Sequence, residues 1–120
     1  CFRMNMNEIA TAARYQIPIV QVVVNNHVLG MVRQWQNLFY GERYSSTTLY
    51  DKVDFVKLAE SYGAKGIRVT EKSEMKAAFE QAKANRALKV PTLIEFMLDP
   101  EVQVYPMVRP GGTLEDLLMD

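Results

Sequence analysis

The sequence predicts an α/β domain in which a parallel β-sheet is flanked by helices. Two runs, IPIVQVVVNN and VPTLIEFMLD, are nearly continuously apolar, as strands buried on both faces are. AKGIRV predicts a short third strand. Segments of helical period separate these runs, and the crossovers are long enough to join parallel strands. A chain of 120 residues has room for one such domain.

The first half of the chain predicts two helices on either side of a strand. Asn5 is expected to cap a helix over 6–16, with Glu8 in the reciprocal capping position. The strand IPIVQVVVNN follows. Gly30 then opens a second helix that runs to about Tyr40, and the polar segment after it predicts an exposed connection.

The second half predicts two more helices and a tail. Asp54 is expected to cap a third helix and Gly63 to end it in the left-handed conformation. Ser73 is expected to cap a fourth helix. We divide the chain into an α/β core over 1–99 and a tail over 100–120, whose prolines and glycines predict an extended path before a short last helix.

Charge and composition argue against several kinds of partner. Lys plus Arg and Asp plus Glu each count 14, so no net field attracts nucleic acid or an anionic membrane. Cys1 is the only cysteine and His27 the only histidine, which argues against a disulfide scaffold and an all-protein zinc site. No membrane span or signal peptide is indicated. We expect a soluble cytoplasmic protein.

The chain opens without an initiator methionine on CFRMNMNEIATAA, which predicts a turn running into a helix. We expect the chain to be part of a longer protein, truncated at its N-terminus. Loss of upstream strands would leave an apolar sheet edge uncovered, which favours self-association.

Asn25 and Asn26 are the first candidate site, because ligands of open parallel sheets bind beyond the carboxyl ends of the strands. An amide oxygen suits Mg²⁺, which also takes carboxylate and phosphate oxygens. Gly30 allows a tight turn that points carbonyls around Val28 inward. Paired asparagines after a strand are also typical of a plain turn, because Asn tolerates positive φ and bonds to its own backbone. The residues alone favour the plain turn over a metal site.

Two further features carry a weaker signal. A helix that starts near Asn5 offers N–H groups to a phosphate, as every helix N-terminus does. Met31, Trp35 and Leu38 share one stripe of the second helix, which is typical of a core, although Trp also walls small-substrate cavities. The residues therefore indicate an α/β domain, leave a phosphate-and-metal site as a hypothesis, and name no reaction.

Longer stretches are more specific: FRMNMNEIATAARYQIPIVQVVVNN, LGMVRQWQNLFYGERYS, VDFVKLAESYGAKGIRV and YPMVRPGG. They resemble the carboxyl-terminal cofactor domain of the acetolactate synthase (acetohydroxyacid synthase) large subunit, a thiamine-diphosphate enzyme. The resemblance covers nearly all of the chain. Many thiamine-diphosphate enzymes share the Asn-Asn that ends the signature of this cofactor. GMVRQWQNLFY and PMVRPGG are more specific, because they resemble acetolactate synthases in particular.

The resemblance implies a role for several residues. Asn26 would give its side-chain oxygen to the Mg²⁺ that holds the cofactor diphosphate, and Val28 would give its backbone carbonyl. Asn25 would mainly shape the turn. In the family, the thiamine-diphosphate signature begins with Gly-Asp-Gly, and Cys1 matches the residue directly after it. Cys1 would therefore direct its backbone N–H at the diphosphate. The aspartate of the signature is not in this chain.

A second group of residues would surround the substrate. Gly30 and Met31 are expected to lie beside the cofactor, and Met31, Val32 and Trp35 to line the substrate channel. Trp35 would bias the choice of the second keto acid. The tail around 107–112 is expected to fold over the site as a lid.

The reaction that the resemblance implies is decarboxylation of pyruvate, followed by addition of the hydroxyethyl unit to pyruvate or 2-oxobutyrate in branched-chain amino-acid biosynthesis. The glutamate that activates the cofactor would come from a partner subunit of a homodimer or larger homo-oligomer. FAD would bind mainly outside this chain, and a regulatory small subunit is left open. We assign no catalytic residue here and expect the isolated chain to be inactive.

Two alternatives remain. One is another thiamine-diphosphate carboligase or decarboxylase, acting on glyoxylate, sulfoacetaldehyde or a benzoyl acid; Trp35 and the PMVRPGG tail argue against it. The other is a non-catalytic α/β module that binds a phosphate ligand or mediates assembly. An acidic residue just before Cys1 would separate them, because one amide and carbonyls alone hold Mg²⁺ weakly.

Overall fold

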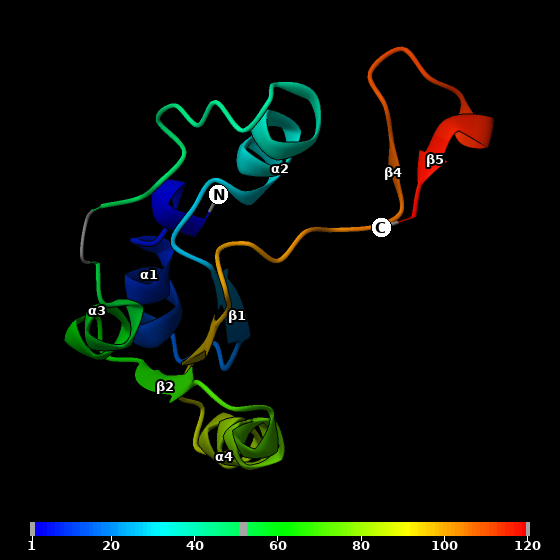
Figure 1. Cartoon of the computed structure of the whole chain (residues 1–120). Helices are drawn as coiled ribbons and strands as arrows, with labels where there is room; N and C mark the ends of the chain where they lie inside the picture. The colour runs from blue at the N-terminus through cyan, green and yellow to red at the C-terminus, as the bar shows by residue number, and fades with distance from the viewer. Residues whose placement is uncertain (1, 51–52, 120) are drawn as a thin grey trace.

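The computed structural model describes residues 2–50 and 53–119 (Figure 1). Its centre is a three-stranded parallel sheet in the order β1-β3-β2. The strands are β1 (Val20–Asn25), β2 (Lys65–Val69) and β3 (Thr92–Met97). The predicted α/β fold with a parallel sheet is confirmed.

Helices cover the two faces of the sheet through separate apolar clusters. On one face, α1 (Glu8–Arg14) covers β1 and β3, and α3 (Phe55–Ser61) packs against β2 and β3. That cluster consists of Ile9, Val23, Phe55, Ala59, Ala64 and Leu93. On the other face, α4 (Met75–Ala87) packs against β2 and β3. The second cluster consists of Val69, Ala78, Ala82 and Ile94.

β1 is an edge strand, and the expectation that it is buried on both faces is wrong. Val23 is buried under α1 and α3. Val20, Val22 and Val24 point to the opposite face, where they are 39%, 40% and 62% exposed. They stay uncovered because α4 lies against β2 and β3 (Figure 1). The sheet therefore has an exposed apolar edge of the kind that favours association.

The predicted ends of α3 are confirmed. Asp54 caps the helix, and its Oδ1 accepts the N–H of Lys57 at 3.1 Å. Gly63 follows the helix with a φ of +88°. Close packing also requires Gly66 in β2, because a Cβ there would lie 2.7 Å from the backbone oxygen of Val56 in α3.

The predicted cap of the first helix is wrong. A 3₁₀ helix, η1 (Phe2–Met4), occupies the start of the described chain, and α1 begins only at Glu8, after Asn7. The backbone carbonyl of Asn5 accepts the N–H of Glu8 at 3.1 Å. Asn5 therefore lies in the turn between the two helices.

Ser73 does not cap the fourth helix either. It lies inside a 3₁₀ helix, η2 (Lys72–Glu74), for which Glu71 is the N-cap. The Glu74 carboxylate accepts the backbone N–H groups of Thr70 and Glu71 at 2.9 and 3.0 Å. This reciprocal capping starts the helical turn before Ser73 and leads directly into α4.

The remaining elements lie beyond the carboxyl ends of the strands. α2 (Gly30–Phe39) begins and ends where the sequence predicts. The tail passes α2 and then stands away from the body as an antiparallel pair, β4 (Met107–Val108) and β5 (Leu117–Leu118) (Figure 1). The expected last helix is a 3₁₀ turn, η3 (Leu114–Asp116).

Throughout the described ranges, no helix is both long and apolar enough to cross a membrane.

Candidate functional site at the carboxyl edge of the sheet

The Asn25–Asn26 pair forms the turn between β1 and α2. The Oδ1 atom of Asn25 accepts the N–H of His27 at 3.1 Å, and His27 has a φ of +58°. The Oδ1 atom of Asn26 accepts the N–H of Val28 at 3.3 Å. These are the bonds of asparagine turns. A carbonyl oxygen has two lone pairs, so Asn26 retains a second one for a metal.

The backbone of Val28 faces Asn26. Val28 pairs with Thr48 in an antiparallel bridge, in which Leu29 N–H bonds to Thr47 O and Leu49 N–H to His27 O, each at 2.8 Å. In such a pair the central residue directs its own N–H and carbonyl away from its partner. The Val28 N–H bonds to Asn26, so its carbonyl points to that side as well.

Gly30 leaves space for the Asn26 side chain. A Cβ at Gly30 would lie 3.0 Å from the Asn26 Nδ2 atom, so a larger residue would displace the amide. An amide oxygen and a carbonyl oxygen on one side of a turn are hard neutral donors that suit Mg²⁺. The residues present therefore fit part of a magnesium shell.

Other ligands would have to complete that shell. Across residues 2–50 and 53–119, no group of three or more His, Cys, Asp or Glu side chains gathers to hold a metal. Cys1, whose backbone N–H is predicted to meet the diphosphate, lies outside the described residues.

A cavity of about 570 Å³ opens beside the turn. Asn25 and Asn26 contribute to its lining together with apolar side chains that include Phe2, Leu49 and Phe55. A cavity with mostly apolar walls and a few polar groups is typical of a small-molecule site.

The three predicted channel residues, Met31, Val32 and Trp35, line a second cavity of about 480 Å³. Met31 is 63% and Val32 49% exposed, whereas Trp35 and Leu38 are half-buried. The Met31 end of the predicted apolar stripe therefore forms the wall of a cavity and does not belong to a core. Trp35 packs edge-on against Phe39, with ring centroids 5.7 Å apart. Met31 lines this second cavity, whereas Asn26 lines the first.

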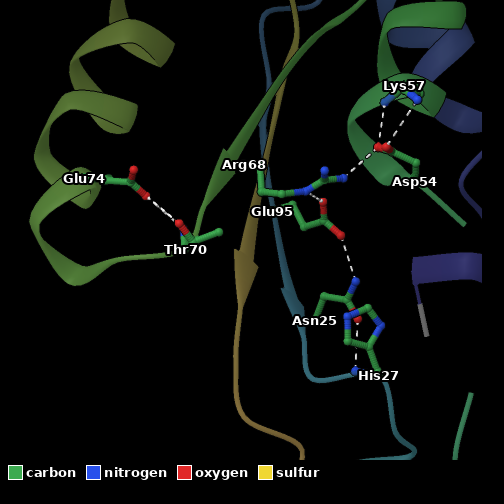
Figure 2. Close-up of polar contacts among 8 residues, drawn as sticks. All are labelled: Asn25, His27, Asp54, Lys57, Arg68, Thr70, Glu74 and Glu95. Atoms are coloured by element: carbon green, nitrogen blue, oxygen red, sulfur yellow. Dashed lines mark hydrogen bonds and ion pairs between the residues drawn. The ribbon is translucent and has the colours of Figure 1, made fainter. Parts of the chain in front are cut away.

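Glu95 is a residue of this region that the sequence interpretation missed. It lies in the middle of β3 and is 1% exposed. Its Oε1 accepts the Asn25 Nδ2 at 2.7 Å, and its Oε2 accepts the Arg68 Nε at 2.9 Å (Figure 2). Arg68 continues the network to Asp54, with an Nη2–Oδ1 distance of 2.7 Å. A glutamate inside the apolar run VPTLIEFMLD is the signal that could have revealed it.

The charges of this network stabilise one another. The hydrogen bond to Glu95 raises the pKa of the Arg68 guanidinium. The backbone N–H of Lys57 lowers the pKa of the Asp54 carboxyl, and the hydrogen bond from Arg68 lowers it further. Both groups are therefore held in their charged forms at neutral pH.

These features define an α/β domain with a ligand site at the carboxyl edge of a parallel sheet. The family described as "Thiamine pyrophosphate enzyme, C-terminal TPP binding domain" matches residues 1–96. The chain belongs to this family of thiamine-diphosphate-binding domains.

Curated relatives include three large subunits of acetolactate synthase. Identity is 44% to a probable large subunit from Methanocaldococcus jannaschii, 38% to one from Haemophilus influenzae and 40% to that of isozyme 2 from Escherichia coli. Each match covers 98% of this chain but only 19%, 20% and 21% of the relative. The chain thus spans about a fifth of the length of these relatives.

A solved structure with the same fold is the thiamine diphosphate-dependent 4-hydroxybenzoylformate decarboxylase of Rhodococcus jostii. It superposes with a TM-score of 0.72 at 30% sequence identity. The match covers 82% of this chain and 18% of that one.

Proposed function

We propose that this chain is the cofactor-binding, carboxyl-terminal part of an acetolactate synthase. The observation that carries the proposal is its 38–44% identity to acetolactate synthase large subunits over 98% of its length. The reaction proposed for the longer protein is decarboxylation of pyruvate and transfer of the hydroxyethyl unit to pyruvate or 2-oxobutyrate.

In this proposal Asn26 and the Val28 carbonyl hold the Mg²⁺ that binds the cofactor diphosphate. Their common orientation and the space left by Gly30 support the assignment. Thiamine diphosphate, when bound, supplies the electron sink for decarboxylation. The residues of this chain bind and orient it, and the apolar wall of the adjoining cavity excludes water.

The second cavity is proposed as the place of the acceptor keto acid. Met31, Val32 and Trp35 provide an apolar wall, and Arg43 lines the same cavity with a cationic group that suits a carboxylate. Pyruvate and 2-oxobutyrate differ by one methylene, which an apolar wall of this kind distinguishes by about 1–3 kcal/mol.

Several parts of the enzyme belong to the proposal and lie outside this chain. They are the remaining metal ligand, the activating glutamate of a partner subunit, the FAD site, and any regulatory subunit. A homodimer or larger homo-oligomer in the cytoplasm is proposed with them. The chain matches only 19% of the length of the Methanocaldococcus jannaschii large subunit, which supports placing these parts outside it.

The proposal is tested by assaying acetolactate formation from pyruvate, with thiamine diphosphate and Mg²⁺ present. The longer protein that carries this segment is expected to form acetolactate, and the 120-residue chain alone is expected to form none. Acetolactate formation by the chain alone would contradict the assignment of essential groups to other parts of the enzyme.

The second candidate, a decarboxylase of benzoyl-type keto acids, is favoured by the Rhodococcus jostii structure. Offering 4-hydroxybenzoylformate to the same longer protein separates the two. Aldehyde formation from this acid, with no acetolactate from pyruvate, would replace the proposed function with the second candidate.

A further inference from the structure

We infer that Glu95 is a positioning residue whose buried carboxylate, acting through Asn25, sets how tightly the metal and the cofactor diphosphate are held at Asn26. The inference deepens the proposed function and rests on it. It assigns to β3 a role in a site that the sequence places only between β1 and α2.

The first observation is the buried position of the Glu95 carboxylate. Glu95 lies in the central strand, opposite Val23 of β1 and Arg68 of β2. At 1% exposure, a carboxylate is far more costly than an apolar side chain unless both oxygens are paired. Each oxygen has one donor, the Asn25 amide at 2.7 Å and the Arg68 guanidinium at 2.9 Å.

The second observation is the route from Glu95 to the site. The Asn25 amide donates to Glu95 through Nδ2 and accepts the His27 N–H through Oδ1, so Glu95 fixes which end of the amide faces the turn. That bond holds His27 at its positive φ of 58°. Because Asn26 lies between these two residues, the direction of its side chain depends on both.

The third observation is what anchors Glu95 itself. Arg68 bonds to Glu95 through Nε and to Asp54 through Nη2, and Asp54 caps α3 (Figure 2). The network thus spans all three strands and ends at the N-cap of α3. Because Arg68 fixes the position of the Glu95 carboxylate, the carboxylate can impose an orientation on the Asn25 amide.

The inference is tested by exchanging the hydrogen-bond donor and acceptor in the contact between Glu95 and Asn25. Glu95→Gln presents an amide to two donors, so one of the two hydrogen bonds must fail. Asn25→Asp sets two carboxylates against each other. The double variant restores both bonds, because the introduced glutamine donates to the introduced aspartate and still accepts from Arg68. It also restores the net charge.

The affinity for Mn²⁺ in the presence of thiamine diphosphate is measured by electron paramagnetic resonance, in the longer protein that carries this chain. Each single variant is expected to bind Mn²⁺ about 10-fold or more weakly, as is usual when a residue that orients a metal ligand is changed. The double variant is expected to recover to within about threefold of the parent.

Ile94→Val is the matched control for stability. Ile94 is the preceding residue of β3, fully buried on the α4 face. This variant is expected to lower the melting temperature of the ligand-free protein and leave Mn²⁺ affinity unchanged. If Glu95 only stabilised the fold, affinity would follow melting temperature across all variants, and the inference would be overturned.

Asn26→Ala separates failure of the inference from failure of the proposed function. Loss of Mn²⁺ affinity in this variant, with parental affinity in Glu95→Gln, overturns the inference alone. Unchanged affinity in Asn26→Ala overturns the proposed metal site and the inference with it. If the charge-changing single variants do not fold, Asn25→Ser decides, because serine is too short to reach Glu95 while its hydroxyl still accepts the His27 N–H in a serine turn; parental affinity there overturns the inference.

Discussion

Single side chains hold the connections of this domain by bonding to backbone N–H groups. Asn25 bonds to His27, Asp54 to Lys57 and Glu74 to Thr70. In each case one short polar side chain satisfies a donor that the neighbouring helix or strand leaves free. The geometry of the site therefore depends on individual residues whose effects can be measured separately.

The hydrogen bonds of Glu74 predict that the free energy of unfolding depends on pH. The N–H groups of Thr70 and Glu71 lower the pKa of its carboxyl. Its contribution is present above the unfolded-state pKa of about 4.3 and is lost as the pH falls through the lower folded-state pKa. Glu74→Gln should therefore destabilise the protein more at pH 7 than at pH 3.

Urea unfolding at the two pH values checks this, with Glu60→Gln as a control for the substitution itself. An equal loss of stability at both pH values would show that the charge of Glu74 is not what stabilises the turn.

The position of Trp35 in the wall of the second cavity predicts that it affects which acceptor keto acid the proposed enzyme prefers. Trp35→Leu removes part of the apolar wall of the second cavity, so contact with the longer acceptor 2-oxobutyrate is lost first. The product ratio, measured with both keto acids competing, should shift several-fold toward the pyruvate-derived product, within the about 1–3 kcal/mol that one methylene is worth. Cofactor affinity should change less. An unchanged ratio would show that Trp35 is only a packing residue.

At the scale of elements, α2 connects the site with both neighbouring segments. Its first residue, Gly30, lies against Asn26. Gln34 pairs with the N–H and the carbonyl of Val104, at 3.0 and 2.9 Å. Gln36 bonds to the carbonyl of Ser45 at 3.0 Å. The helix therefore holds the loop before α3 and the start of the tail in separate contacts.

These contacts predict separable changes in hydrogen exchange. Gln34→Ala removes the two hydrogen bonds to Val104, worth about 1 kcal/mol each, so exchange of the Val104 amide should rise about tenfold or more while the loop around Thr47 stays protected. Gln36→Ala is the matched control on the same helix, because it bonds to Ser45 and Thr47 instead.

Gln36→Ala should accelerate exchange around Thr47 and leave Val104 unaffected. Acceleration of both segments in both variants would mean that α2 itself unfolds locally. The idea of two independent contacts would then be wrong. The predicted role of the tail as a lid is a separate matter and stays a prediction.

At the scale of the whole molecule, the chain leaves much apolar surface exposed. The uncovered face of β1 is one part, and the start of the tail beside α2, with Val102 and Val104 at 56% and 68% exposure, is another. The long axis measures 48 Å against 27 and 25 Å for the others. With a formal net charge of zero, no electrostatic repulsion opposes association.

We therefore predict that the isolated chain self-associates through the β1 edge. Light scattering should show a mass that rises with protein concentration. Val24→Lys should reduce this rise, because a charge on an edge strand opposes pairing. Val102→Lys, which adds the same charge on the tail, is the control. A clean monomer at high concentration, or equal effects of the two variants, would contradict the prediction.

Much of the fold follows from neighbours in the sequence. The Asp54 cap, the Gly63 stop and the start of α2 at Gly30 depend on residues a few positions apart, and all three are confirmed. The predicted caps at Asn5 and Ser73 are wrong because competing local bonds form at the preceding or following turn. The roles of Asn26, Val28 and Trp35 stay predictions.

The sequence by itself determined the α/β class, the position of Asn25 and Asn26 at a strand end, and the two ends of α3 at Asp54 and Gly63, because these depend on local periodicity and turn chemistry. Only the tertiary structure decided that Glu95 meets Asn25, 70 positions away, and that Met31 and Asn26 line different cavities. It also decided that β1 is an edge strand. Strand order and helix placement bring distant residues together, and periodicity within one segment carries no information about them.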